Sequence, residues 1–176
     1  MNTDKFELFR YVLRFYTYKA QEFIPHPRLR ALIFKLFGSC IGTMVRIEDI
    51  RIGNQAHWGF NNLVIGDYSV LTRNSFLDLT GKITIGNKTV IAGSIFTHQD
   101  TGSCLFNSPT VERYPRKVSQ VTIGNNVYVA ANSIILCGIT VGDNSVIGAG
   151  SVVTSDIPAN ALVAGVPAKV KKTFDV

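Results

Sequence analysis

The chain has 176 residues, a formal net charge of +6 and 46% hydrophobic residues, which fits one domain with a modest appendage. No apolar run approaches the ~20 residues of a membrane span, and charged residues such as Asp4 and Arg10 argue against a secretory signal at the N-terminus. Three widely spaced cysteines predict neither a disulfide framework nor a zinc site, and they favour a reducing compartment, the cytoplasm.

The positive charge lies at the two ends of the chain. Residues 1–35 hold seven Lys/Arg against three Asp/Glu, residues 36–168 hold eight of each, and the tail from Lys169 has three lysines and one aspartate. A nucleic-acid-binding protein would more often show a basic stripe with interleaved aromatic residues. We therefore expect no nucleic-acid partner.

The first segment is predicted to be helical. Apolar residues recur there at alternating three- and four-residue spacing, as on one face of an amphipathic helix: Phe6, Phe9, Leu13, Tyr16, Ala20 and Phe23. Pro25 and Pro27 end this helix, and a second short helix is expected before Gly38. Residues 1–38 are thus predicted to form a helical cap over the open end of the next domain.

The basic residues of this segment offer an alternative to simple capping. Membrane or a lipid-linked substrate would contact Arg10, Arg14, Lys19, Arg28, Arg30 and Lys35. The acidic residues mixed among them weaken this interpretation, so only a weak peripheral membrane contact is expected.

From about Ile50 the apolar residues recur every six positions. Ile65, Leu71 and Leu77 form one triplet, and small or β-branched residues follow four positions later in most repeats. A period of six describes neither a helix nor a hairpin, and it is typical of a parallel β-helix. Three six-residue repeats make one 18-residue coil. In each repeat the apolar residue points inward, and the small residue allows the chain to bend at the corner between two walls. Residues 39–176 are predicted to form this domain.

The repeat is interrupted once, between Thr97 and Gln120. A segment of this length in an otherwise economical repeat is usually functional. We expect a loop over residues 98–120 that leaves the wall of the β-helix after His98 and reaches a neighbouring subunit.

The repeat then continues without a slip to the C-terminal region. The inward positions are Ile123, Val129, Ile135, Val141, Ile147 and Val153. The run closes with Asp156-Ile157-Pro158 and with Ala164-Gly165-Val166-Pro167-Ala168-Lys169.

This ordered run, strongest over residues 121–172, resembles the hexapeptide-repeat acyltransferases. It is most similar to sugar O-acetyltransferases of the galactoside, maltose, nodulation-factor and colanic-acid or O-antigen types. The resemblance implies a left-handed β-helix and a homotrimer with three active sites, each between two subunits. It also implies acetyl-CoA as the acyl donor, a sugar or polysaccharide precursor as the acceptor, and no metal.

Acetyl transfer to a hydroxyl needs a base that titrates near neutral pH, and histidine is the natural choice. Of the three histidines, His26 lies between prolines and His57 sits in an irregular coil, whereas His98 matches the catalytic histidine of the resembled family. Glu112 resembles the assisting glutamate of the family, and Asp100 competes for the same role. Either carboxylate could instead be a solvated loop residue.

The resemblance also implies binding residues. Sugar binding is expected at Arg73, Asn74 and Asp78, although Asn74 could be a turn residue and Asp78 an exposed wall residue. CoA binding is expected at Tyr128, Ala131, Ala149, Thr154, Lys169 and Lys172. The backbone near Ala131 is expected to stabilise the oxyanion, Tyr128 replaces a frequent family tryptophan, and the two lysines would otherwise be a solvated tail.

Three other functions remain open. An N-acetyltransferase acting on an amino sugar or nucleotide sugar would share the same scaffold, and so would a non-catalytic β-helix. A zinc enzyme on this fold needs three converging histidines, which the positions at 26, 57 and 98 do not favour.

Overall fold

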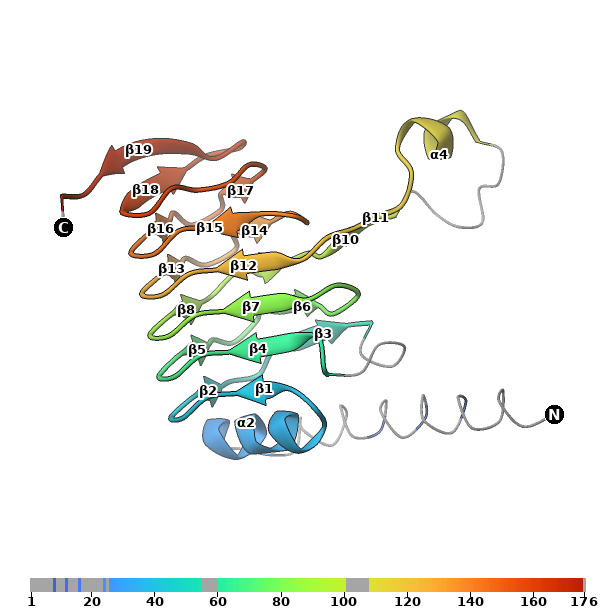
Figure 1. Ribbon diagram of the computed structural model, residues 1–176, viewed down its shortest axis with the longest axis vertical. Helices are drawn as coiled ribbons and strands as arrows, with labels where there is room; N and C mark the ends of the chain where they lie inside the picture. The colour runs from blue at the N-terminus through green and yellow to red at the C-terminus, as the bar shows by residue number, and fades with distance from the viewer. Residues whose placement is uncertain are drawn as a thin grey trace.

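The computed structural model describes Leu8, Val12, Tyr16, Ile24 and residues 26–54, 60–100 and 108–175. In this part of the chain, short strands wind upward in successive coils and form three sheets that surround one apolar interior (Figure 1). The strands of these sheets are parallel, except that the last strand of the seven-stranded sheet is antiparallel. The architecture confirms the predicted parallel β-helix. The left-handed winding implied by the resemblance, and the domain division at residue 38, stay predictions.

We call the three walls the first, second and third sheets, in the order in which each coil visits them. The first sheet contains β1 (Cys40–Ile41), β4 (Leu63–Ile65), β7 (Ile83–Ile85), β12 (Val121–Ile123) and β15 (Thr140–Val141). The second contains β2 (Arg46–Ile47), β5 (Val70–Leu71), β8 (Val90–Ile91), β13 (Tyr128–Val129), β16 (Val146–Ile147), β18 (Ala161–Ala164) and β19 (Lys169–Thr173). The third contains β3 (Arg51–Gly53), β6 (Phe76–Asp78), β9 (Ser94–Ile95), β14 (Ile134–Ile135) and β17 (Val152–Val153).

The register of the upper coils follows the six-residue repeat. Tyr128 pairs with Val146, and Ile134 pairs with Val152, so each partner lies three repeats further along the chain. The inward positions stack above one another and are buried: Ile123, Val129, Ile135, Val141, Ile147 and Val153. The predicted inward ladder is therefore confirmed.

The small residues at the corners also link successive coils. Ser69, Thr89 and Ser145 are fully buried, and their hydroxyls donate to backbone carbonyls of the next coil at 2.8 to 2.9 Å. A buried hydroxyl must find such a partner to offset the loss of water. These corner residues therefore contribute hydrogen bonds between coils as well as compact turns.

Helix α2 (Pro27–Leu36) covers the lower end of the β-helix, beside β1 and β2 (Figure 1). Phe34 is 2% exposed and packs edge-on against Phe60. Exposed end coils need such a cover. The expected first helix, over residues 6–23, lies outside the described residues except for Leu8, Val12 and Tyr16.

The predicted interruption begins at His98. Strands β10 (His98–Gln99) and β11 (Lys117–Val118) pair antiparallel and leave the wall of the β-helix as an arm, which carries α4 (Pro109–Arg113) at its far end (Figure 1). Ser119 N donates to Thr97 O at 2.9 Å, which closes the base of the arm. The chain then resumes its coil at β12.

Candidate active site

His98 stands where the arm leaves the third sheet, just after β9. Its Nδ1 atom lies 2.6 Å from Oδ2 of Asp78, and its side chain is 25% exposed. A histidine fixed at one ring nitrogen and open to solvent on part of its surface is suited to proton transfer. The pair therefore defines the candidate catalytic centre.

The Asp78 carboxylate is buried beneath His98 and is surrounded by donors. Oδ1 accepts hydrogen bonds from Asn54 Nδ2 at 2.8 Å and from the Thr80 hydroxyl at 2.7 Å. Oδ2 accepts from Thr97 N at 2.9 Å, and the Thr97 hydroxyl lies 2.8 Å away. These donors come from three successive coils, so the carboxylate is held by the stacked scaffold itself.

This environment fixes the charge of Asp78 and the tautomer of His98. Burial by itself raises the pKa of the Asp78 carboxyl, but the hydrogen bonds from His98 and from the three neutral donors outweigh burial and hold that pKa well below its usual range. An ionised carboxylate only accepts, so Nδ1 of a neutral His98 carries the proton. Nε2 is then left with its lone pair as the basic atom.

The sequence placed Asp78 among the expected sugar-binding residues, with an exposed wall residue as the alternative. The structure overturns the exposed alternative and argues for a different role from sugar binding. Leu77, Asp78, Leu79 and Thr80 are all buried, because the in-and-out alternation of the strand stops at the end of β6. Both Asp78 oxygens already accept hydrogen bonds within the protein, so the carboxylate is not available to an acceptor sugar. Its geometry is that of an orienting residue for His98.

Neither carboxylate expected to orient His98 is recorded beside it in the described part of this chain. Glu112 is exposed on α4, at the far end of the arm. Asp100 Oδ2 lies 3.7 Å from Arg116 Nε, across the base of the arm. An assisting role for Glu112 toward the site of a neighbouring subunit stays a prediction.

The other two expected sugar-binding residues lie at the corner between the second and third sheets. Asn74 has a φ of 65°, and its N–H donates to Asp49 O at 3.1 Å. Asparagine tolerates this left-handed conformation better than most residues, which agrees with the turn alternative for Asn74. Arg73 is exposed beside it, and its N–H donates to Glu48 Oε2 at 3.1 Å.

The same corner, several coils higher, contains Ala131 and Ala149. Gly150 N donates to Ala131 O at 3.0 Å, which stacks the two turns directly. Both alanines are exposed, and their own N–H groups have no recorded acceptor within the described residues. A thin ligand could lie along this surface and accept hydrogen bonds from the backbone.

The remaining expected CoA residues lie on the upper coils but do not all gather at this corner. Lys169 on β19 pairs with Ala164, next to the Ala149 turn, whereas Lys172 pairs with Leu162 and lies 5.6 Å from the Phe174 ring. Tyr128 is 47% exposed on β13. Thr154 is exposed just after β17, at the other end of the third sheet.

His98 and the Ala131–Ala149 corner lie at opposite ends of the strands of the third sheet. The corner precedes β14 and β17, and His98 follows β9. One chain therefore holds both halves of the expected site and does not bring them together.

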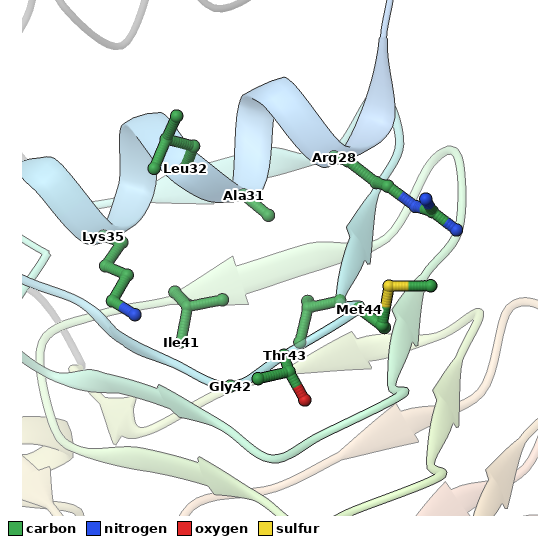
Figure 2. Close-up of a pocket in the computed structure, with 9 residues that line it drawn as sticks. Arg28, Ala31, Leu32, Lys35, Ile41, Gly42, Thr43 and Met44 are labelled. Atoms are coloured by element: carbon green, nitrogen blue, oxygen red, sulfur yellow. The ribbon is translucent and has the colours of Figure 1, made fainter.

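A cavity lies between α2 and the first coil, away from His98. Figure 2 shows Arg28 and Lys35 on either side of Ala31, above Gly42, Thr43 and Met44. Its described lining contains no histidine or carboxylate. The exposed apolar residues Leu32 and Leu36 on this helix keep the expected membrane contact a prediction.

Two features are absent from the described residues. No described helix is long and apolar enough to cross a membrane. No three His, Cys, Asp or Glu side chains gather as metal ligands within the described ranges. His57 lies outside these ranges, and His26 precedes α2 as its N-cap residue.

Comparisons with known proteins place the chain in a family. Residues 120–155 match the bacterial transferase hexapeptide model, which comprises six repeats. The crystal structure of a maltose O-acetyltransferase from Clostridium difficile 630 is 31% identical, with a TM-score of 0.70, over 93% of this chain and 87% of that chain. This chain belongs to the hexapeptide-repeat transferases.

The chain is also similar to two galactoside acetyltransferases. The galactoside O-acetyltransferase of Escherichia coli K12 is 37% identical over 126 residues, which cover 70% of this chain and 53% of that protein. A galactoside acetyltransferase structure in complex with coenzyme A is 27% identical, with a TM-score of 0.66, over 83% of this chain and 70% of that chain. The chain spans about half the length of the first curated relatives it matches.

Proposed function

We propose that this protein is an acetyl-CoA-dependent O-acetyltransferase that acetylates a hydroxyl of a sugar or polysaccharide precursor. The observation that carries the proposal is His98, held through Nδ1 by the buried Asp78 carboxylate at 2.6 Å with Nε2 left as a base. The relatives named for galactoside and maltose O-acetylation, and the CoA complex of one of them, support the choice of donor and acceptor.

The proposed reaction is a direct transfer. Nε2 of His98 takes the proton of the acceptor hydroxyl while the hydroxyl oxygen attacks the thioester carbonyl of acetyl-CoA. The negative charge that develops on the carbonyl oxygen is stabilised by a backbone N–H, for which Ala131 is the candidate. When the carbon–sulfur bond breaks, His98 returns the proton to the CoA thiolate, and no covalent enzyme intermediate forms.

The proposed site is shared between two chains of a homotrimer. The pantetheine arm of CoA lies along the Ala131–Ala149 corner of one chain, with Lys169 near the CoA phosphates, and His98 comes from the next chain. The separation of these elements within one chain supports this arrangement. Because the donor is acetyl-CoA, we place the reaction in the cytoplasm.

The test is the acetyl-CoA consumption of wild-type protein and of the His98→Ala variant, measured against a panel of sugars, amino sugars and nucleotide sugars. Loss of the base should lower kcat/KM for the best hydroxyl acceptor on the order of 10²- to 10⁴-fold. Glu112→Gln and Asp100→Asn are measured beside it, because each tests the assisting role expected of its carboxylate while leaving His98 and Asp78 in place.

Three outcomes would contradict the proposal. Wild-type turnover by His98→Ala on the best acceptor would remove His98 as the base. An amino sugar as best acceptor, with only a small effect of His98→Ala, would favour N-acetylation, because a neutral amine needs less help from a base. Absence of CoA binding by calorimetry would favour a non-catalytic scaffold.

A further inference from the structure

A polar pocket lies at the lower end of the corner that higher up contains Ala131 and Ala149. Its volume is about 460 Å³, and we call it the arginine pocket. It is lined by Pro27, Arg30, Arg46, Glu48, Asp49 and Arg73. Three guanidinium groups in one pocket are typical of sites that bind phosphate or carboxylate, because the planar group offers several donors in a fixed geometry.

Arg30 is the unusual member of this group. It is only 8% exposed, and its Nε donates to the carbonyl of Ile24 at 2.7 Å. No ion pair of its guanidinium with a carboxylate is recorded in the part of the chain that the structure describes. A buried cation without a counter-ion costs free energy. An anionic ligand in the pocket would supply that counter-ion.

The other charges of the pocket partly balance one another. Arg46 Nη2 lies 3.4 Å from Glu48 Oε1, and Glu48 also accepts from the Arg73 N–H. Asp49 is exposed and is the carboxylate that opposes an anion. Arg30 and Arg73 together outweigh it, and the N-terminus of α2 at Pro27 adds its partial positive charge.

The pocket lies on the same corner of the stacked coils as the proposed acetyl-transfer site. Asn74 N donates to Asp49 O, and Thr72 N donates to Ile91 O, which connects the first three coils. The fourth coil, with Ala131, follows directly above, because Ala92 N donates to Val129 O. An acceptor bound below the thioester would therefore extend toward Arg73 and then Arg30.

We propose that the acceptor carries a phosphate group, which binds in the arginine pocket while the sugar hydroxyl lies at the level of His98. The phosphate could belong to a nucleotide diphosphate sugar or to a sugar 1-phosphate, since both present the same anionic oxygens. This inference rests on the proposed function for the sugar, but the pocket's affinity for phosphate does not depend on any turnover.

Binding is tested first, by calorimetry with inorganic pyrophosphate on protein saturated with CoA, so that the CoA-phosphate sites are filled. Arg73→Gln and Arg46→Gln should each weaken pyrophosphate binding on the order of tenfold, because each removes a charge-assisted contact. Arg28→Gln, which removes a charge from the same end of the protein but lines the other cavity, should bind as wild type. Arg30 is left unchanged, because it also holds Ile24.

No pyrophosphate binding by the wild-type protein, or equal binding by all the variants, would overturn the proposal.

Acetyl transfer is then compared for methyl glucoside, methyl glucuronide, glucose 1-phosphate and UDP-glucose. A KM for a phosphate-bearing acceptor at least about tenfold below that of the neutral glycoside, lost in Arg73→Gln, supports the proposal and identifies the source. Equal KM values, or a preference for the glucuronide, would refute a phosphate-bearing acceptor. If no acceptor is turned over while pyrophosphate still binds, the proposed acetyltransferase activity is contradicted. Phosphate binding in the arginine pocket is not.

Discussion

At the scale of single residues, the chemistry depends on how Asp78 and His98 are held. Asp78 reaches only one substrate-facing group, the His98 ring, through the 2.6 Å contact at Nδ1. In the proposed reaction it would therefore act through His98, as a positioning residue. Its removal would allow the ring to rotate and to carry its proton on the wrong nitrogen.

We expect Asp78→Asn to lower kcat/KM by roughly 10²-fold, because the amide cannot accept from all the donors that surround the carboxylate. The decisive measurement is a double-mutant cycle with His98→Ala. If Asp78 acts through His98, Asp78→Asn should cost almost nothing further in the His98→Ala background. A full additional loss there would show that Asp78 has an independent, merely structural effect.

Asp78 should also make folding stability depend on pH. The folded protein holds the pKa of the Asp78 carboxyl below the ordinary aspartate value of 3.8, so the unfolded chain takes up the proton first as the pH falls. The stabilisation is complete well above that value and is lost progressively below it. Urea unfolding between pH 3 and 6 should show a smaller acid loss for Asp78→Asn than for wild type. Equal pH slopes would argue against the depressed pKa.

The contact between Asp78 and His98 could not be predicted from the sequence, although His98 itself could be singled out as a candidate. His98 matched a family position at the break in the repeat, whereas Asp78 follows the inward Leu77 and should face outward in a regular strand. Counting coils gives the missing signal, since Leu77 pairs with Ile95 and places Asp78 beneath the start of the arm. The contact arises from a local departure from alternation, which the six-residue period cannot show.

At the scale of elements, the β-helix was predictable because each strand repeats one simple rule: one residue points inward and its neighbour outward. In β15, Val141 is buried and Thr140 is exposed. The contacts at places where this alternation stops were not predictable. One example is the pairing of β10 with β11, which directs the arm outward. Those contacts depend on which segments meet in space.

The same substitution at Val141 and at Thr140, the inward and outward residues of β15, tests this alternation directly. Val141→Asp should lower the free energy of unfolding by roughly 3 kcal/mol or more, because it leaves an unpaired charge in the interior. Thr140→Asp places the same charge one residue away, at the surface, and should change stability by only about 0.5 kcal/mol. Denaturant unfolding gives both values, and similar losses for the two variants would contradict the assigned orientation of the strand.

At the scale of the whole molecule, the position of His98 at one end of the third sheet and of Ala149 at the other implies a site made by two chains. A chain that lacks the base and a chain with a blocked corner would then be defective in different halves. We expect His98→Ala and Ala149→Trp each to be nearly inactive alone. Unfolded together at equal amounts and refolded, they should recover about a quarter of the wild-type activity, because that fraction of interfaces combines two intact halves.

The control for this experiment is each variant refolded by itself, which should stay inactive. No recovery in a mixed sample whose assembly by size-exclusion chromatography matches wild type would show that a single chain contains a complete site.

The hydrogen-bond donors around Asp78 also imply that heating affects the candidate site before it unfolds the upper coils. Asn54 belongs to the lowest coil, Thr80 to the next and Thr97 to the third, and repeat proteins open most easily at their ends. When the lowest coil frays, Asp78 loses a donor and the base loses part of its support, while the upper coils remain wound. We therefore expect the proposed acetyl transfer to be lost on heating before the upper coils unfold, and its loss to report on the N-terminal coils.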